Sequence, residues 1–325
     1  MANNGILNIN KPQNMTSHDV VSVVRRTLGI KRVGHTGTLD PMATGVLPIC
    51  VGKSTRIIEY LDLDIKAYRC TMIFGLETDT QDIWGEVVGK NSTDHLTEDK
   101  VRAAFKGFDG VIDQTPPMYS ALKVNGKKLY EYAREGVSVE VKSRKVFIKS
   151  LVIEDISLDE SKEKWVTFTV ECSKGTYIRT ICQDVGQILG CGGTLSCLER
   201  TKSGIFDIDS AISLDRLREM PRDEIDKLFL PSDYPLTHFG KVIIDESTAW
   251  MFVNGWHLPM EKCNIMLEPE YATKEFYLPI REEYKKAYNI YGTIGGMEEF
   301  LGVAFYNDTY KKLVADKVFY VRDSE

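Results

Sequence analysis

Two charged residues that lie far apart in the sequence have the types and settings that covalent catalysis needs. Asp40 is the one carboxylate in the glycine-rich segment VGHTGTLDPMATGVLP (residues 33–48), and Arg179 falls in the first turn of a predicted helix, beside its apolar stripe. A cation there opposes the helix dipole and is stabilised by a carboxylate partner. We therefore predict an Asp40–Arg179 pair in which the arginine keeps the carboxylate ionised and fixes its rotamer, as a carboxylate nucleophile requires. The alternatives are a turn-forming aspartate and a solvent-exposed arginine.

Aromatic residues close to basic ones point to a nucleic-acid substrate. Tyr68 belongs to the alternating segment KAYRCTMIF, whose parity places it on the apolar side, so it either packs in the core or stacks on a nucleobase. Residues 118–136 (MYSALKVNGKKLYEYAREG) mix four basic side chains with three tyrosines, a composition suited to a nucleic-acid strand. We expect Lys123 of this segment, and Lys11 of the N-terminal segment NINKPQ, to bind the substrate.

The net charge of −6 argues weakly against nucleic-acid binding, but the charge is unevenly distributed. Residues 1–60 carry seven Lys or Arg against three Asp or Glu, a net of +4, and residues 121–150 carry eight against three, a net of +5. A chain with this asymmetry can present a basic face to phosphates while it stays acidic overall. The alternative is that these are ordinary solvated surface charges.

Composition and motif spacing argue against several other classes of protein. The 325 residues, 43% apolar and 27% charged, are typical of a folded chain with one large and one small domain or two medium ones. No apolar run approaches the roughly eighteen residues of a membrane span, and the N-terminus lacks a signal-peptide layout, so we predict a cytoplasmic protein. The seven cysteines and five histidines show neither C-x-x-C nor H-x-x-x-H spacing, which predicts reduced, mostly buried thiols and no metal. GVLPICVGKST is no phosphate loop, because six residues rather than four separate Gly45 from Gly52.

Hydrophobic periodicity and capping residues predict the elements that hold these side chains. Helices are expected over SHDVVSVVRRTL, with Ser17 as N-cap and Gly29 as its end, over LTEDKVRAAFKGF, and over TYIRTICQDVGQIL, whose apolar stripe includes Ile188 and ends at Gly190. GVLPICVG, KAYRCTMIF and WVTFTVEC are predicted strands. Residues 213–240 are expected to form a surface helix and then a linker, and the last 85 residues a small β-rich domain. The irregular alternation indicates an α+β fold, with a mixed, mainly antiparallel central sheet flanked by helices.

Six segments resemble, in order and spacing, the bacterial TruB-type tRNA pseudouridine synthases. They are NINKPQNMTSHDVV, GHTGTLDPMATGVLPICVGKSTR, KAYRC, TDTQDIWG, PPMYSALKVNGKKLYEYAREG and CSKGTYIRTICQDVGQILGCGGTLSCLERTKSG, and together they span about residues 5–215. The resemblance implies an enzyme that isomerises uridine 55 in the T-loop of tRNA after flipping the nucleotide out, with no cofactor. Guide-RNA-dependent archaeal and eukaryotic relatives share text like GHTGTLDP, whereas ATGVLPICVGKSTR and the compact insert after it are of the bacterial, stand-alone type.

The resemblance also implies a role for each candidate residue. Asp40 is the nucleophile, with attack on C6 of the base and attack on C1′ of the sugar both open. Arg179 pairs with Asp40, Tyr68 stacks on the target uracil, and His35 fills the space that the flipped nucleotide leaves. Tyr177 and Leu198 line the base pocket. The glycines of residues 33–48 are expected to let this backbone approach the RNA closely.

The domain layout and partners follow from the same resemblance. We expect a catalytic domain with the pseudouridine synthase fold over residues 1–235 and a PUA-like RNA-binding domain over residues 236–325 that holds the acceptor stem of tRNA. NGWHLP and FLGVAFY resemble segments of such a domain, although about forty residues with acidic insertions separate them. The T-arm of tRNA is the expected substrate, with no membrane contact and no obligatory protein partner.

Three other functions fit parts of the sequence. A non-catalytic RNA-binding protein would use the basic face without needing Asp40. A sister pseudouridine synthase would act on another RNA, or would need guide RNA and partners. A glycosylase-like hydrolase would stop after bond cleavage and release free uracil. The joint presence of Asp40, Tyr68 and Arg179 favours the tRNA pseudouridine synthase.

Overall fold

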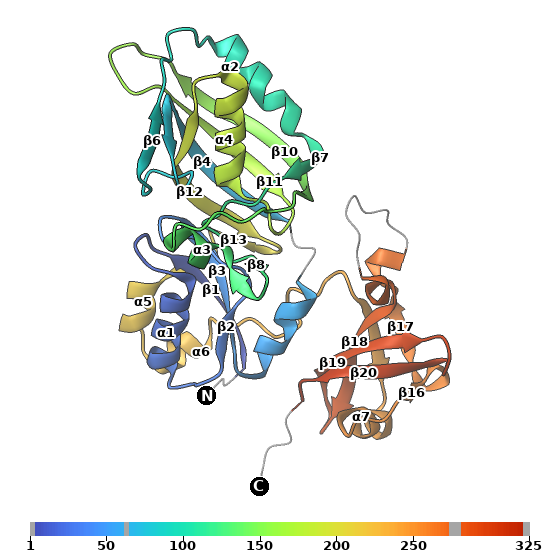
Figure 1. Cartoon of the computed structure of the whole chain (residues 1–325). Helices are drawn as coiled ribbons and strands as arrows, with labels where there is room; N and C mark the ends of the chain where they lie inside the picture. Colours follow the sequence, from blue (N-terminus) through green and yellow to red (C-terminus); the bar gives the residue numbers. More distant parts are fainter. Residues whose placement is uncertain (1–3, 62–64, 273–280, 321–325) are drawn as a thin grey trace.

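The computed structural model describes residues 4–61, 65–272 and 281–320, which form two domains, each built on its own β-sheet (Figure 1). The larger sheet has ten strands in the order β14-β1-β3-β12-β4-β11-β10-β7, with β13 paired to β12 and β2 paired to β3. Only the β1–β14 and β3–β12 pairs of this sheet are parallel, so the predicted mixed, mainly antiparallel sheet is confirmed. Its strands are β1 (Gly5–Lys11), β2 (Val33–His35), β3 (Thr44–Val51), β4 (Lys66–Phe74), β7 (Gly110–Gln114), β10 (Arg144–Ser157), β11 (Trp165–Cys172), β12 (Gly193–Ser203), β13 (Phe206–Asp207) and β14 (Ile212–Ser213).

Helices and short ribbons surround this sheet. The helices α2 (Glu98–Phe105) and α4 (Ile178–Leu189) pack along its β4–β10 half, and α1 (Ser17–Leu28), α5 (Leu214–Glu219) and α6 (Arg222–Asp226) gather at its other end (Figure 1). Two ribbons project from it, β5 (Leu76–Thr78) with β6 (Val87–Lys90), and β8 (Lys123–Val124) with β9 (Lys127–Lys128). The short helices η2 (Lys106–Phe108) and α3 (Leu129–Arg134) complete the domain. None of the helices in the described residues is long and apolar enough to span a membrane.

The predicted helix ends are correct at two glycines and wrong at one cap. Gly29 and Gly190 both end their helices in the left-handed conformation. The N-cap of α1 is Thr16 rather than Ser17, because Thr16 and Asp19 form a reciprocal capping box and the Ser17 hydroxyl bonds elsewhere. The predicted stripe of α4 is wrong at Ile188, which is 62% exposed, whereas the neighbouring Leu189 packs against the core.

The region predicted as one surface helix and a linker contains two helices. Pro221 separates α5 from α6, because proline cannot continue a helix. Leu217 and Ile225 are buried in the core, so these helices are not purely superficial. Five of the seven cysteines are buried, which confirms the prediction of mostly buried thiols.

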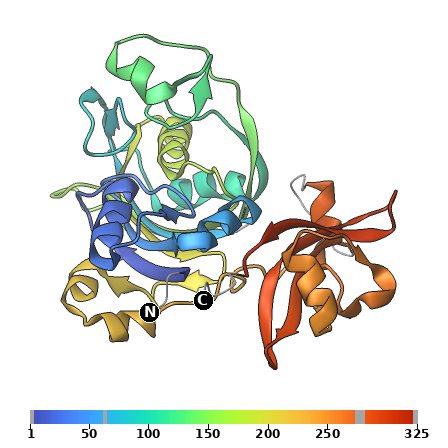
Figure 2. The same cartoon turned by 90° about the horizontal axis from the view of Figure 1, so that it is seen from below.

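The C-terminal domain is β-rich, as predicted, and has its own core around Phe252 and Ile290. Its sheet has the order β16-β20-β19-β18-β15-β17, and α7 (Glu246–Val253) packs against it. Seen from below, this domain lies beside the first one (Figure 2). Its remaining elements are β15 (Gly240–Ile244), β16 (Leu258–Pro259), η3 (Met260–Lys262), β17 (Asn264–Leu267), η4 (Glu270–Ala272), η5 (Glu282–Lys286), β18 (Ala287–Ile294), β19 (Met297–Asn307) and β20 (Lys312–Val318).

The segment GKSTR is no phosphate loop and begins the 3-10 helix η1 (Gly52–Tyr60). Residues of this helix contact the C-terminal domain. The Tyr284 hydroxyl donates to the carbonyl of Glu59 at 2.8 Å, and the Arg56 guanidinium donates to the carbonyl of Val318 at 3.0 Å. The ring of Tyr60 packs edge-on against Phe239 and Tyr284. The C-terminal domain is therefore fixed to the helix that directly follows β3.

Candidate active site

Asp40 lies in the loop between β2 and β3, and the start of α1 holds that loop in place. The Ser17 hydroxyl accepts a hydrogen bond from the backbone N–H of Leu39 at 2.8 Å and donates to its carbonyl at 3.1 Å. On the other side of Asp40, the carbonyl of Pro41 accepts the backbone N–H of Asn14 at 2.9 Å. The residues before and after Asp40 are thus both tied to the N-terminal segment, which limits the movement of the carboxylate.

Lys11 belongs to this anchoring and does not face a substrate. Its side chain is fully buried, and Nζ donates to the carbonyls of Pro12 at 2.8 Å and Met15 at 2.6 Å and approaches that of Pro41 at 3.4 Å. Burial lowers the pKa of Lys11 to about 8, partly opposed by the charge of Asp40. We therefore replace the substrate-binding role expected for Lys11 with a positioning role for the Asp40 loop.

A second buried cation, Arg200 of β12, supports the same loop from beneath and was not singled out in the sequence. Its guanidinium is completely buried and donates to three carbonyl oxygens of the loop and of β3. The acceptors are Val46 at 2.7 Å, Gly37 at 3.1 Å and Thr38 at 3.5 Å. Because all three acceptors are backbone atoms, the arginine fixes the path of the chain rather than one side chain.

Close packing against protein requires a glycine at position 45, at the start of β3. A Cβ on Gly45 would lie closer than 3.0 Å to the backbone of Arg200, and Gly45 also has a φ of +102°. A Cβ on Gly37 would lie 2.7 Å from Nζ of Lys66, which is the far end of a flexible side chain. The expectation that the glycines admit RNA is therefore replaced at Gly45, whose close neighbour is β12.

The structure contains the predicted Asp40–Arg179 ion pair, with Nε of Arg179 3.0 Å from Oδ2 of Asp40. The side chain of Arg179 is only 5% exposed, whereas that of Asp40 is 36% exposed. The other two nitrogens of the guanidinium donate to the carbonyls of Thr80 at 2.9 Å and Tyr119 at 3.0 Å. The arginine is therefore held from three sides, and the carboxylate it holds still reaches solvent.

The position of Arg179 depends on where α4 begins. The side-chain amide of Gln114 accepts the backbone N–H of Tyr177 at 2.7 Å and donates to the Tyr177 carbonyl at 3.0 Å. This paired bond joins the first residue before α4 to the end of β7. Arg179 follows two residues later, so its place in the first turn is set by the edge strand of the sheet.

Asp82, a second carboxylate near Arg179, was not predicted. Its Oδ2 lies 3.8 Å from NH1 of Arg179, and its Oδ1 accepts the Thr80 hydroxyl at 2.8 Å and the backbone N–H of Trp84 at 3.0 Å. Burial raises the pKa of Asp82, against the effect of these hydrogen bonds and of Arg179. The sequence signal was present, since Asp82 belongs to the TDTQDIWG segment.

Among the remaining predicted residues, Tyr68 lies in a strand and Tyr177 beside the start of a helix, as predicted, whereas His35 lies in strand β2 rather than in a loop. Tyr68 is buried on the apolar side of β4, and burial raises the pKa of its hydroxyl to about 12, an effect that the nearby Arg200 guanidinium partly opposes. Leu198 is buried in β12, one strand away. His35 is half-buried on β2, and burial lowers the pKa of its imidazole. Tyr177 is half-buried under the guanidinium of Arg144, and Lys123 is exposed on the β8–β9 ribbon.

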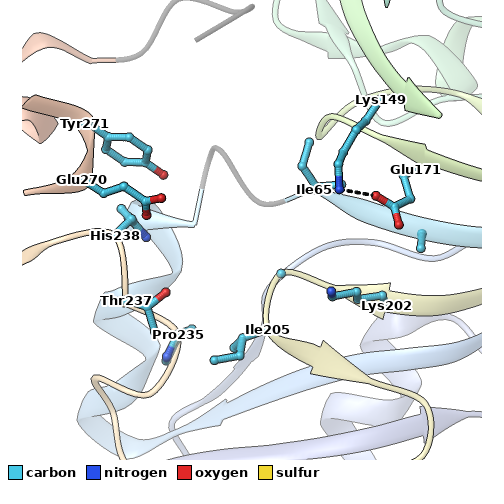
Figure 3. A pocket seen from close by; sticks show the side chains of 12 residues that line it. Ile65, Lys149, Glu171, Lys202, Ile205, Pro235, Thr237, His238, Glu270 and Tyr271 are labelled. Carbon is cyan, nitrogen blue, oxygen red and sulfur yellow. Dashed lines mark hydrogen bonds and ion pairs between the residues drawn. The ribbon is translucent and has the colours of Figure 1, made fainter. Parts of the chain in front are cut away.

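A cavity of about 300 Å3 between the two domains is separate from this site (Figure 3). Lys149, Glu171 and Lys202 line it from the larger sheet, and His238 and Glu270 line it from the other side. Lys149 and Glu171 form an ion pair across one wall. Ala67 of β4 also borders this cavity, whereas the next residue, Tyr68, faces the core, so the cavity lies on the opposite face of the sheet.

Two family descriptions match consecutive parts of the chain. Residues 25–178 match the TruB family pseudouridylate synthase N-terminal domain, and residues 179–237 match the tRNA pseudouridylate synthase B C-terminal domain. The tRNA pseudouridine synthase B of Alkaliphilus oremlandii is 50% identical over 252 residues, which are 78% of this chain and 82% of that protein. The protein of the same name from Clostridioides difficile is 46% identical over 255 residues, 78% of this chain and 83% of its own length.

Solved structures share the fold over nearly the whole chain. A chain of a Cbf5–Nop10–Gar1 complex superposes with a TM-score of 0.71 at 24% identity, covering 98% of this chain and 86% of its own. A chain of an archaeal box H/ACA sRNP Nop10–Cbf5 complex gives 0.70 at 23% identity, covering 98% and 87%. At this level of identity the similarity shows the arrangement of the two sheets and no more.

We expect Arg200→Lys to destabilise the protein. The one nitrogen of a lysine cannot occupy the three separate positions from which the three guanidinium nitrogens of Arg200 donate. Each buried acceptor left without a donor costs about 1–3 kcal/mol. The free energy of unfolding, measured by urea denaturation, should fall by about 2–5 kcal/mol. The matched control is Arg69→Lys, on the exposed side of the neighbouring strand, which should change it by less than about 0.5 kcal/mol. Equal stability of the two variants would contradict the role given to Arg200.

Proposed function

The chain belongs to the TruB family of pseudouridylate synthases, and we propose that it converts uridine 55 in the T-loop of tRNA to pseudouridine with Asp40 as the nucleophile. The reaction breaks the N1–C1′ glycosidic bond, turns the uracil and forms a C5–C1′ bond. C5 loses one proton to water and N1 gains one, so the atoms balance without an oxidant or a group donor. The observation that carries the proposal is a carboxylate that reaches solvent while a buried arginine, each nitrogen of which has an acceptor, holds it.

Asp40 is the residue to which we assign the covalent chemistry. A carboxylate can attack an electrophilic carbon and hold one fragment while the other rotates. For this it must be held in place while one face stays open to the substrate. Arg179 holds it, because Nε bonds to Oδ2 of Asp40 from the buried side and the rest of the guanidinium is fixed by backbone carbonyls.

The aromatic and apolar residues near Asp40 are assigned to binding the extruded base. Extruding a nucleotide from a folded loop costs a few kcal/mol, and stacking on an aromatic ring offsets about 1–3 kcal/mol of that cost. The ring of Tyr68 provides this surface on β4, with Leu198 on the neighbouring strand and Tyr177 at the start of α4 completing the pocket. His35 occupies the space that the base leaves in the loop. Its lowered pKa keeps the imidazole neutral at pH 7, so it fills space without adding charge.

Basic side chains and the C-terminal domain are assigned to binding the rest of the RNA. Lys123, Lys127 and Lys128 lie on the β8–β9 ribbon, in a segment with a net charge of +5, and contact the phosphates of the T-arm. Lys127 and Lys128 also lie over the rings of tyrosines in the same segment, which leaves a mixed basic and aromatic surface. The C-terminal domain, a PUA-like module in this proposal, holds the acceptor stem.

Pseudouridine mapping in tRNA incubated with the pure protein tests this function directly. We expect one new pseudouridine at position 55 and none with Asp40→Asn, while the variant still binds tRNA, because the amide keeps the shape but cannot act as the nucleophile. Release of tritium from 5-labelled uridine measures the rate. Product at another position would indicate a sister synthase, free uracil a hydrolase, and loss of RNA binding together with activity would contradict the chemical role of Asp40.

Arg179→Lys should lower the rate of tritium release by about a hundredfold or more. The single nitrogen of lysine cannot take the places of the three guanidinium nitrogens that bond to Asp40 and the two carbonyls. A misplacement of about 1 Å at a reacting group costs about this much in rate. Circular dichroism and thermal unfolding should show that the variant remains folded. Full activity in this variant would refute the proposed role of the ion pair.

Tyr68→Leu should lower kcat strongly while the Kd for tRNA rises only modestly. Leucine keeps the packing in the core but removes the ring on which the flipped uracil stacks, and most of the RNA contacts lie elsewhere. Tyr68→Phe is the matched control, because it keeps the ring and loses only the hydroxyl near Arg200. If Tyr68→Leu turned over at the wild-type rate, the stacking role would be wrong.

A further inference from the structure

An unusual group of exposed apolar side chains lies next to the proposed active site. Ile83, Trp84, Val87 and Val88 are each between 42% and 66% exposed, and all four fall within six consecutive residues. They form the turn between β5 and β6 and the start of β6. Scattered apolar residues on a surface need no explanation, but a cluster of large ones beside a functional site indicates a contact surface.

The turn that carries these side chains is tightly built. A Cβ on Gly85 would lie closer than 3.0 Å to both Thr80 and Asp79. Oδ1 of Asp79 accepts the backbone N–H of Glu86 at 2.8 Å, and the backbone N–H of Ile83 donates to the carbonyl of Leu195 in β12 at 3.0 Å. Trp84 is therefore held toward solvent by a fixed backbone, and its exposure is a property of the fold.

The same turn contacts the proposed catalytic residues and residues 118–136, here called the basic segment. The backbone N–H of Trp84 donates to Asp82, whose other carboxylate oxygen is 3.8 Å from Arg179. Oδ2 of Asp79 accepts the hydroxyl of Tyr119 at 2.9 Å, and the carbonyl of Tyr119 accepts a nitrogen of Arg179. Trp84 thus extends from a network that includes Asp40 and borders residues 118–136.

We propose that Trp84 stacks on an unpaired nucleobase of the RNA substrate next to the target uridine, an inference that rests on the proposed function. An exposed indole is a strong stacking surface for a base of any identity. The contact is with a base face and not with a phosphate, because Glu77, Asp79 and Glu86 make this ribbon acidic. RNA is favoured over a protein partner because the turn is hydrogen bonded to Tyr119 of the proposed RNA-binding segment and, through Asp82, lies against Arg179 beside Asp40.

The experiment measures KM and kcat for tritium release from a T-arm stem-loop with Trp84→Ala and Trp84→Phe. We expect the KM of Trp84→Ala to rise about tenfold and that of Trp84→Phe to rise much less, because phenylalanine keeps a ring for stacking. The matched control is Val152→Ala, an exposed apolar residue on β10, which should match the wild type. If Trp84→Ala is poorly folded, the proposal is tested instead by comparing the fluorescence quench of the wild type with that of Trp84→Phe.

Tryptophan fluorescence reports the contact without catalysis. A base stacked on the indole of Trp84 should quench it when RNA binds, so the quench should disappear in Trp84→Phe and persist in Trp256→Phe, which removes the exposed indole of the C-terminal domain. An abasic nucleotide placed at each unpaired loop position should identify the base. At that position the abasic nucleotide should lower the RNA affinity of the wild type, but it should not lower the affinity of Trp84→Ala any further.

Several results would overturn the proposal. The first two are a wild-type KM in Trp84→Ala and a fluorescence quench that survives in Trp84→Phe. A third is a loss of RNA affinity in Trp84→Ala that stays the same with every abasic RNA. The fourth is a dimer that dissociates in Trp84→Ala while RNA binding stays the same, which would indicate a protein contact. A wild-type protein that binds the stem-loop with a Trp84-dependent quench but makes no pseudouridine would contradict the proposed function and leave the RNA contact standing.

Discussion

The requirement to give each nitrogen of a buried guanidinium an acceptor organises this structure. Arg179 is almost completely removed from water, and its nitrogens bond to Asp40, to the carbonyl of Thr80 and to the carbonyl of Tyr119. These three acceptors come from loops separated by about forty residues each along the chain. One side chain in the first turn of α4 therefore sets the relative positions of the Asp40 loop, the β5–β6 turn and the basic segment.

Arg200 repeats this solution on the other side of the Asp40 loop. Its bonds to the Asp40 loop and to β3 all go to backbone carbonyls, so it constrains where the loop runs, whereas Arg179 constrains where the carboxylate points. The loop is held between two buried cations and is also anchored through Ser17 and Lys11. This division explains why a segment with three glycines is well fixed, since the glycines remove side chains that would prevent the close contacts.

The sequence predicted the features that depend on local pattern or on unmatched charge. The parity of β4 placed Tyr68 correctly, Gly29 and Gly190 marked helix ends, and the missing partners of Asp40 and Arg179 indicated their pairing. The residues it missed depend on tertiary contacts. The burial of Lys11 and Arg200 follows from the sheet order, which places each of their strands between two others, and Asp82 has a clear purpose only beside Arg179. Ser17 resembles a cap, but its hydroxyl bonds to a loop that begins about twenty residues later.

The direct continuity of β3 between the Asp40 loop and η1 has a geometric consequence for substrate choice. An extended strand of eight residues spans about 26 Å at 3.3 Å per residue, and it neither stretches nor bends easily. Since η1 carries the contacts to the C-terminal domain, the spacing between that domain and the carboxylate is fixed by strand length. Any ligand that engages both ends at once must match this separation, so the molecule measures length as well as shape.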